Sequence, residues 1–177
     1  MSAAIQTEAG DTFPFPKDYS FPAFFTRQPN LQTHHAQLEK WSALVLAYAH
    51  HHRLFRFSPT HPVFHNKKLD RRFAEADVRE LLEHMRKDGR AEWVGNEVFV
   101  YWRRPEDWAR KLEKWVEDTA QKGHVLTLYE ITEGEATLGT DFHGMDGEVL
   151  LKALNHLVKR GRAQIFGQDD SLGVKFF

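Results

Sequence analysis

The sequence contains two similar segments, one in the middle of the chain and one at its end. Residues 78–102 read VRELLEHMRKDGRAEWVGNEVFVYW, and residues 150–177 read LLKALNHLVKRGRAQIFGQDDSLGVKFF. With an offset of 72 residues, apolar positions fall on apolar positions, and Gly89-Arg90-Ala91 falls on Gly161-Arg162-Ala163. Two copies are too few for a solenoid. The repeat therefore indicates a small domain that occurs twice.

Each copy predicts the same local structure, a helix followed by a β-hairpin. Apolar residues at helical spacing precede Gly89 and Gly161, and a glycine in the left-handed conformation is a common helix end. Beyond each glycine, apolar residues alternate with polar ones, as in a strand with one buried face. A second loop longer by two residues would place Val100 on Val174 and Trp102 on Phe176. The residues expected in the two cores are Trp41, Val45, Leu82, Met85 and Trp93, and Trp115, Leu154, Leu157, Ile165 and Phe176.

A helix with a sharp stop and a hairpin forms the second half of a winged helix, so we expect the first half before each copy. Apolar residues at helical spacing lie over residues 38–48 and again over residues 108–116. Thr127 and Glu130 have the spacing of a capping box, and Asp146 suits the N-cap of the last helix. We predict a mostly helical α+β protein of two tandem winged-helix domains, residues 31–102 and 103–177.

Composition and charge restrict the classes of function. Lys and Arg number 24 and Asp and Glu number 25, which gives a net charge of -1 and disfavours non-specific nucleic-acid binding. The absence of cysteine excludes disulfides and thiol chemistry. The sequence has no apolar run near the roughly 20 residues that span a bilayer, and its start lacks the features of a secretory signal. We expect a cytoplasmic protein with a flexible tail over residues 1–20.

The sequence offers little for catalysis or metal binding. Adjacent side chains on a helix point about 100° apart, and no pair among His50, His51 and His52 has the i,i+4 spacing of helical metal sites. The acidic stretch over residues 130–144 shows no pattern of burial that would tune carboxylates for acid–base chemistry. A nucleophile elbow and an HExxH motif are both absent from the sequence. We predict no enzymatic activity, no metal and no cofactor.

A winged helix also raises nucleic-acid binding, because its third helix often lies in a major groove. Acidic residues lie among the basic residues of the first candidate helix, and both helices are ordinary in charge, so these charges also fit an ordinary solvent face. Nucleic-acid binding is therefore kept as the alternative function. The basic residues concerned are Arg79, Arg86 and Lys87 in the first copy and Lys152, Lys159 and Arg160 in the second.

The segment over residues 21–30, FPAFFTRQPN, holds three phenylalanines and two prolines just before the first expected helix. Proline favours extended, polyproline-like structure, and aromatic side chains on an extended segment suit an apolar groove of a partner. The alternative is that Phe21, Phe24 and Phe25 pack against the first domain. The chemistry of these residues alone leaves both possibilities open.

The sequence contains, in this order, FPAFFTRQPN, WRRPEDW, TLYEITEGE, FHGMD and a terminal GVKFF. These motifs resemble the family of the smallest ESCRT-II subunit, the vacuolar protein-sorting-associated protein 25 family, from about residue 19 to the end. The resemblance implies tandem winged helices and an adaptor role in sorting ubiquitinated cargo into multivesicular bodies. It further implies two copies of the chain per complex with the two larger subunits, peripheral recruitment to endosomes, and recruitment by the second domain of the ESCRT-III subunit that starts filament assembly.

The resemblance also implies site residues, position by position. The family's double-proline and aromatic motif falls on residues 21–25, where Ala23 stands in place of the second proline. The family's partner-contacting arginine corresponds to Arg71 within FHNKKLDR, and a guanidinium suits paired contacts with a carboxylate and a carbonyl. The expected contacts with the larger subunits are Phe21, Pro22, Phe24, Phe25 and Arg71. The position of the ESCRT-III contact comes from the residue pattern instead: a staple residue and an aromatic residue flank one loop of the second domain, so we expect Phe142, His143 and Met145 to make it.

Overall fold

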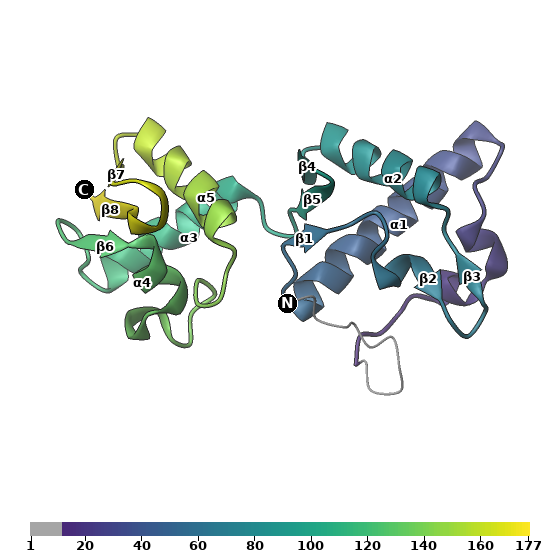
Figure 1. Cartoon of the computed structure of the whole chain (residues 1–177), viewed down its shortest axis with the longest axis horizontal. Helices are drawn as coiled ribbons and strands as arrows, with labels where there is room; N and C mark the ends of the chain where they lie inside the picture. The colour runs from purple at the N-terminus through teal and green to yellow at the C-terminus, as the bar shows by residue number, and fades with distance from the viewer. Residues whose placement is uncertain (1–11) are drawn as a thin grey trace. The chain divides into compact units, whose positions relative to one another are not determined.

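The computed structural model describes residues 12–177, which divide into two compact units with a boundary between Trp102 and Arg103. We call these units domain 1, up to Trp102, and domain 2, from Arg103. None of the helices in the described residues is long and apolar enough to cross a membrane. Figure 1 labels the elements of both domains.

Domain 2 has the simpler order of elements. It consists of α3 (Pro105–Asp118), β6 (Val125–Thr127), α4 (Leu128–Glu133), η4 (Glu135–Thr137), α5 (Gly147–Lys159), β7 (Ala163–Phe166), η5 (Asp169–Ser171) and β8 (Gly173–Phe176). The three strands form an antiparallel sheet in the order β6-β8-β7, and α3 packs against α5 (Figure 1). Helix, strand, two helices and a two-stranded wing make a winged helix.

Domain 1 repeats this order with one substitution. It consists of α1 (Leu31–His52), β1 (Arg56–Phe57), η3 (Pro62–Phe64), β2 (His65–Asn66), β3 (Arg71–Arg72), α2 (Glu75–Lys87), β4 (Ala91–Val94) and β5 (Glu97–Val100). Its sheet has the order β1-β5-β4. A short β2–β3 hairpin, preceded by η3, stands where domain 2 has α4 (Figure 1).

The helix ends predicted from the sequence are confirmed. Thr127 and Glu130 form both bonds of a capping box at the start of α4. The Asp146 side chain accepts hydrogen bonds from the backbone amides of Glu148 and Val149 at the start of α5. Gly89 and Gly161 follow α2 and α5 with φ of 70° and 69°, a conformation that costs glycine little.

The predicted alignment of the two hairpins is wrong by two residues. Ala91 pairs with Val100 in domain 1, and Ala163 pairs with Phe176 in domain 2, so Val100 rather than Trp102 is the counterpart of Phe176. The loop over residues 95–96 is replaced by residues 167–172, a difference of four residues. The longer loop contains its own turn, η5, which the apolar pattern of the strands could not reveal.

Eight of the ten expected core residues are buried, and two are not. Trp93 and Ile165 occupy the same position in β4 and β7, and both are half-exposed. The strands that carry them lie at the edge of each sheet, so only part of each side chain is covered. The indole Nε1 of Trp93 donates to Glu83 at 3.2 Å.

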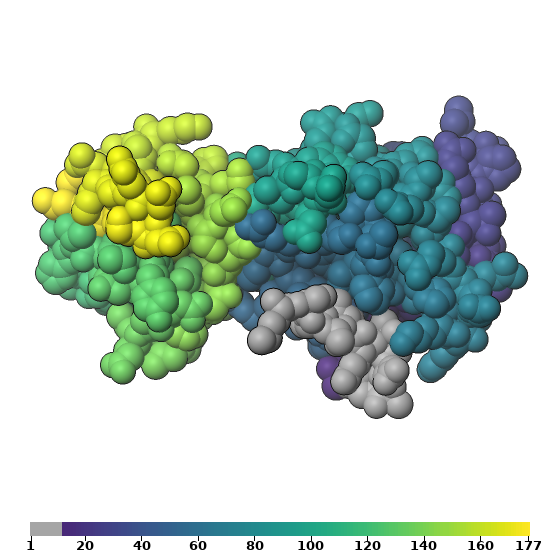
Figure 2. Space-filling view, viewed as in Figure 1, coloured from purple at the N-terminus to yellow at the C-terminus, as the bar shows by residue number. Residues whose placement is uncertain are grey.

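Residues 12–30 fold onto domain 1, and we call them the N-terminal arm. The arm forms two 3-10 turns, η1 (Lys17–Ser20) and η2 (Pro22–Phe25), and buries Phe13 and Tyr19. The prediction of a flexible tail is therefore wrong for residues 12–20; residues 1–11 lie outside the described residues. The prediction of an extended segment at 21–25 is also wrong, because the backbone closes i→i+3 hydrogen bonds there. In the space-filling view the arm (purple) lies packed on domain 1 (Figure 2).

Candidate protein-docking site

Two of the three phenylalanines in residues 21–25 belong to the core of domain 1. The Phe24 and Phe73 rings, which come from before and after α1 in the sequence, both stack on the Trp41 indole, with centroid distances of 4.4 Å and 4.9 Å. Phe25 meets the same indole edge-on at 5.4 Å. Phe24 and Phe25 are only 8% and 4% exposed. The expectation that a partner covers these two side chains is wrong, because Trp41 already covers them.

The backbone of the arm is bonded to buried polar groups of α1. The indole Nε1 of Trp41 donates to the carbonyl of Phe24 at 2.9 Å. Gln37 donates from Nε2 to the carbonyls of Phe24 and Thr26 at 3.0 Å and 2.8 Å, and its Oε1 accepts from the amide of Gln28. Buried backbone groups need such partners to offset the loss of water. The turn over residues 22–25 is therefore fixed by hydrogen bonds as well as by ring packing.

A second set of bonds fixes the arm next to the β2–β3 hairpin. The Tyr19 hydroxyl donates to the carbonyl of Val63 at 2.8 Å, and Asn66 Nδ2 donates to the carbonyl of Tyr19 at 2.6 Å. The Oδ1 atom of Asn66 accepts from the amides of Lys68 and Leu69 and so closes the hairpin turn. One asparagine thus holds both the arm and the loop that leads to Arg71.

A third contact involves one carboxylate of α2. Arg27 donates from Nε and Nη2 to Glu80 at 3.0 Å and 3.2 Å, and His34 Nε2 lies 2.8 Å from the same carboxylate. The hydrogen bond from Arg27 is the main cause that lowers the pKa of Glu80 below its ordinary value. Glu80 therefore joins the arm, α1 and α2. Sequence reasoning missed Gln37, Asn66 and Glu80, because the apolar pattern carries no signal for polar side chains that bond a distant backbone.

The exposed residues of the predicted site lie on two neighbouring segments of domain 1. Phe21 is 59% exposed, and Pro22 and Arg71 are also exposed. Strand β3, which carries Arg71, packs beside η2, which begins at Pro22. The turn that begins at Pro22 therefore lies beside the strand that carries Arg71, and Phe21 directly precedes that turn. We call Phe21, Pro22 and Arg71 the docking surface.

The residues predicted to contact the ESCRT-III subunit are mostly core residues. Phe142 and Met145 are buried in domain 2, and the Phe142 ring lies 6.0 Å from the rings of both Trp108 and Trp115. His143 is half-buried, with Nδ1 3.3 Å from the hydroxyl of Thr137. Phe142 and Met145 do not form an accessible surface, because both side chains are buried in the core of domain 2 and Phe142 packs near the tryptophans of α3.

Domain 2 instead exposes apolar side chains on the outer face of its sheet. Val125 and Phe166 lie on this face, since they pair with Lys175 and Gly173 respectively, and Phe177 follows two residues after Lys175. Val125, Phe166 and Phe177 are 53%, 42% and 49% exposed. The Phe166 ring lies over Gly173, where a Cβ atom would come within 3.1 Å of it. We call Val125, Phe166 and Phe177 the outer face of domain 2.

The corresponding face of domain 1 is closed by its own side chains. Phe99, the counterpart of Lys175, is buried below the Arg56 guanidinium, whose carbon lies 4.8 Å from the ring centroid. Tyr101 lies nearly parallel to Phe99 and donates its hydroxyl to Glu92 at 2.6 Å. Within residues 12–177 the two copies of the fold therefore differ in this respect, because the face is open and apolar in domain 2 and covered in domain 1.

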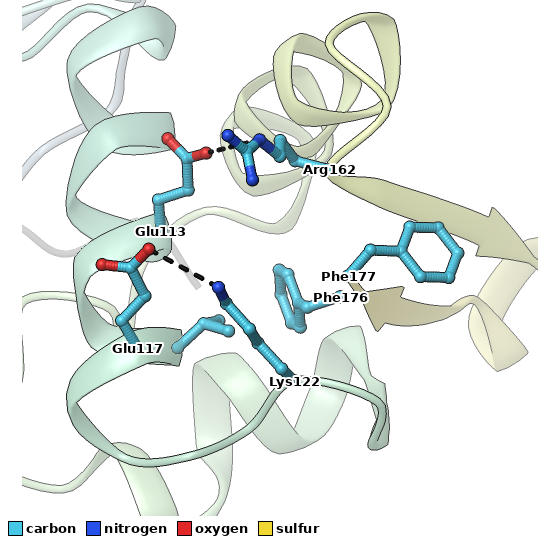
Figure 3. Close-up of a pocket in the computed structure, with 7 residues that line it drawn as sticks. Glu113, Glu117, Lys122, Arg162, Phe176 and Phe177 are labelled. Carbon is cyan, nitrogen blue, oxygen red and sulfur yellow. Dashed lines mark ion pairs between the residues drawn. The ribbon is translucent and has the colours of Figure 1, made fainter.

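A small hollow lies between α3 and the C-terminal end of β8. It is lined by Glu113, Glu117, Lys122, Arg162 and the two terminal phenylalanines, and its volume is about 10 Å³. Figure 3 shows the ion pairs Glu113–Arg162 and Glu117–Lys122, with Phe177 pointing away from α3. A space of this size holds about one water molecule. It is not a site for a small-molecule ligand.

The basic residues considered for nucleic-acid reading are partly neutralised by neighbours. Arg79 pairs with Glu75, Arg86 pairs with Glu83, and Arg160 pairs with Glu113 at distances of 2.8–3.2 Å. These contacts support an ordinary solvent face on both helices. They do not favour the alternative function.

A cluster of potential metal ligands in domain 1 is an ion-pair network. Glu39, His84 and Asp88 offer ligand atoms within 4.8 Å of one another. The guanidinium of Arg90 bonds both carboxylates, and His84 Nε2 lies 2.6 Å from Glu39. The hydrogen bond with His84 is the main cause that lowers the pKa of Glu39. The Arg90 guanidinium thus already supplies a positive charge to the two carboxylates of this cluster.

Sequence comparisons give a consistent relationship. A family model described as ESCRT-II complex subunit matches residues 18–146. Vacuolar protein-sorting-associated protein 25 of Homo sapiens is 39% identical over 173 residues, which cover 94% of this chain and 98% of that protein. The same protein of Xenopus laevis is 38% identical over 172 residues, with 93% and 99% covered. The chain belongs to the ESCRT-II subunit family.

Solved structures of the ESCRT-II family have the same fold. The crystal structure of subunit VPS25 of the endosomal trafficking complex ESCRT-II matches with a TM-score of 0.83 and 26% identity, covering 92% of this chain and 98% of that one. A chain in the crystal structure of the endosomal complex ESCRT-II (VPS22/VPS25/VPS36) matches with a TM-score of 0.82, covering 91% and 98%. The prediction of two tandem winged helices is confirmed. The family is one of non-enzymatic scaffold and adaptor subunits.

Proposed function

We propose that this chain is the adaptor subunit of an ESCRT-II complex and that it binds VPS22 and VPS36 through the docking surface. The observation that carries the proposal is the exposure of Phe21, Pro22 and Arg71 on two neighbouring segments, η2 with the residue before it and β3, in an arm and a hairpin that are bonded to each other. Aromatic residues, phenylalanine included, and arginine are enriched at protein interfaces. Two copies of the chain join one copy of each larger subunit in this proposal.

The test is co-expression of the full chain with VPS22 and VPS36, followed by native mass measurement. The double variant Phe21→Ala, Arg71→Asp is expected to weaken assembly by two or more orders of magnitude, since burying one aromatic side chain contributes about 1.5–3 kcal/mol and reversal of a charge adds repulsion. The control is Arg110→Asp, which reverses an exposed charge on α3 of domain 2. Wild-type assembly by the double variant would refute the docking surface.

Domain 2 supplies the second contact of the proposed adaptor, with the ESCRT-III subunit that starts filament assembly. Support comes from the outer face of domain 2, whose apolar residues are open where domain 1 covers its own. An adaptor with both contacts bridges the larger ESCRT-II subunits to ESCRT-III, and so acts in sorting ubiquitinated cargo into multivesicular bodies. It works at the cytoplasmic side of endosomes, recruited peripherally through its partners.

This second contact is tested with residues 103–177, a compact unit with its own buried core. The fragment is expected to bind the ESCRT-III subunit, and residues 1–102 are not. Phe166→Ser together with Phe177→Ser is expected to reduce binding at least tenfold. Tyr129→Ser removes an exposed aromatic of α4 and serves as the control. Equal binding by both halves would contradict a role specific to domain 2, and full binding by the double variant would contradict the location.

A further inference from the structure

The turn that presents the docking surface is anchored on both sides. On one side Tyr19 is bonded to Asn66 of the hairpin, and on the other side Phe24 is bonded to Gln37 and Trp41 of α1. Phe21 and Pro22 lie between these anchors, and η2 closes with a bond from the amide of Phe24 to the carbonyl of Phe21 at 3.0 Å. The exposed residues of the turn are therefore placed by contacts that are not exposed.

Gln37 is an unusual residue for the position it occupies. It is buried on the face of α1 that also carries Leu38, Trp41 and Val45. A buried amide is costly unless its donors and its acceptor are all bonded. Both Gln37 donors and its acceptor bond to backbone groups of the arm, at residues 24, 26 and 28. Its hydrogen bonds therefore serve the arm.

We infer that Gln37 is a positioning residue for assembly. Its hydrogen bonds hold the arm in the binding-competent conformation in the free chain, before a partner binds. This inference rests on the proposed function of the docking surface. When only a fraction of molecules has the binding-ready conformation, the apparent affinity is reduced by that fraction. Loss of the Gln37 bonds lowers the fraction with the turn in place, while Phe21, Pro22 and Arg71 stay unchanged in chemistry.

The test uses Gln37→Met in the full chain, because methionine has a similar length and forms none of these hydrogen bonds. Amide hydrogen exchange of residues 24–28 is measured in the free chain, and the Kd for the VPS22–VPS36 assembly is measured by calorimetry. We expect about tenfold faster exchange and about tenfold weaker binding, with a less favourable binding entropy. Arg27→Met removes the exposed ion pair with Glu80, which holds the arm just after the turn. Its effect on exchange and on Kd is expected to be in the same direction but smaller.

Ser42→Ala is the matched control. Ser42 is also buried on α1, but its hydroxyl donates to the carbonyl of Leu38 at 2.8 Å within the same helix. It is expected to lower the melting temperature of domain 1 without changing arm exchange or Kd. A merely structural role of Gln37 would make the two variants behave alike.

Two results would overturn the inference. Unchanged exchange at residues 24–28 in Gln37→Met would show that Gln37 does not hold the arm. Faster exchange with an unchanged Kd would show that assembly does not depend on a preset arm. Failure of the proposed function is distinguishable, since it appears as an unchanged Kd for Phe21→Ala, whereas the exchange measurement needs no partner.

Discussion

The Phe24 ring lies flat on the Trp41 indole, with ring centroids 4.4 Å apart and an interplanar angle of 5°. The same stack continues to Phe73 on a segment before α2. Phe24 and its neighbour Phe25 are thus part of the structural core of domain 1. The phenylalanines of residues 21–25 therefore have two roles: Phe24 and Phe25 pack in the core, whereas Phe21 stays exposed.

Replacing Phe24 by alanine is expected to destabilise the free chain. Removal of a buried phenylalanine typically costs about 3–5 kcal/mol, because apolar contact is lost and a cavity remains. Phe21→Ala is the matched control, since its ring is mostly exposed, and it is expected to change the free energy of unfolding by less than about 0.5 kcal/mol. Chemical denaturation of the full chain measures both. Equal stability of the two variants would show that the stack on Trp41 contributes nothing.

Asn66→Ala is expected to affect both the hairpin and the arm. The substitution removes the bond to the carbonyl of Tyr19 and the two amide bonds that close the turn before Arg71. A buried group left without its partner costs about 1–3 kcal/mol. Exchange protection at Leu69 and Phe21 is expected to fall together. Asn66→Asp keeps the acceptor but loses the donor, so it should preserve protection at Leu69 and lose the contact with Tyr19.

Mild acid is expected to destabilise domain 1 through His61. Burial is the main cause that lowers the pKa of His61 from 6.5 to about 4, and the charge of His52 adds to it. The unfolded chain takes up this proton at a higher pH than the folded chain does. The contribution of His61 to the free energy of unfolding is therefore fully present above pH 6.5 and is lost as the pH drops toward 4. The loss reaches about 3 kcal/mol at pH 4.

The control for this titration is His61→Asn. Nδ1 of His61 accepts from the amide of Val63 at the start of η3, and an asparagine oxygen can replace that acceptor. The variant is expected to show a flatter stability profile between pH 6.5 and 4.5. Below that range Glu39 and Glu80, whose pKa values are lowered by their partners, contribute in both proteins. Parallel profiles for the two proteins would rule His61 out as the cause.

Two glycines of domain 2 are expected to respond in opposite ways to alanine. A Cβ atom at Gly134 would lie 2.3 Å from the carbonyl oxygen of Glu130, which accepts the Gly134 amide at the end of α4. A Cβ atom at Gly147 meets nothing within 4 Å at the start of α5. Gly134→Ala is expected to lower the melting temperature of residues 103–177. Gly147→Ala is expected to stabilise them by up to about 1 kcal/mol. A loss of stability in both variants would contradict the steric argument.

The sequence by itself determined the local structure and the duplication. Helical apolar spacing, the glycines after α2 and α5, and the caps at Thr127 and Asp146 act over a few residues, and each has the predicted structure. The family resemblance rested on ordered motifs, which also need no tertiary information. Repetition of the local signals at a fixed offset was enough to predict two similar domains.

The tertiary structure alone decided which apolar groups are available to a partner. An apolar residue must be covered, but its identity does not say whether its own chain or another provides the cover. Phe24, Phe25 and Phe142 are covered by tryptophans of α1 and α3, far from them in sequence. Phe21 and Phe166 remain exposed despite the same chemistry. The hairpin alignment and the bonds of Gln37 were hidden for the same reason, since loop length and long-range backbone contacts leave no periodic pattern in the sequence.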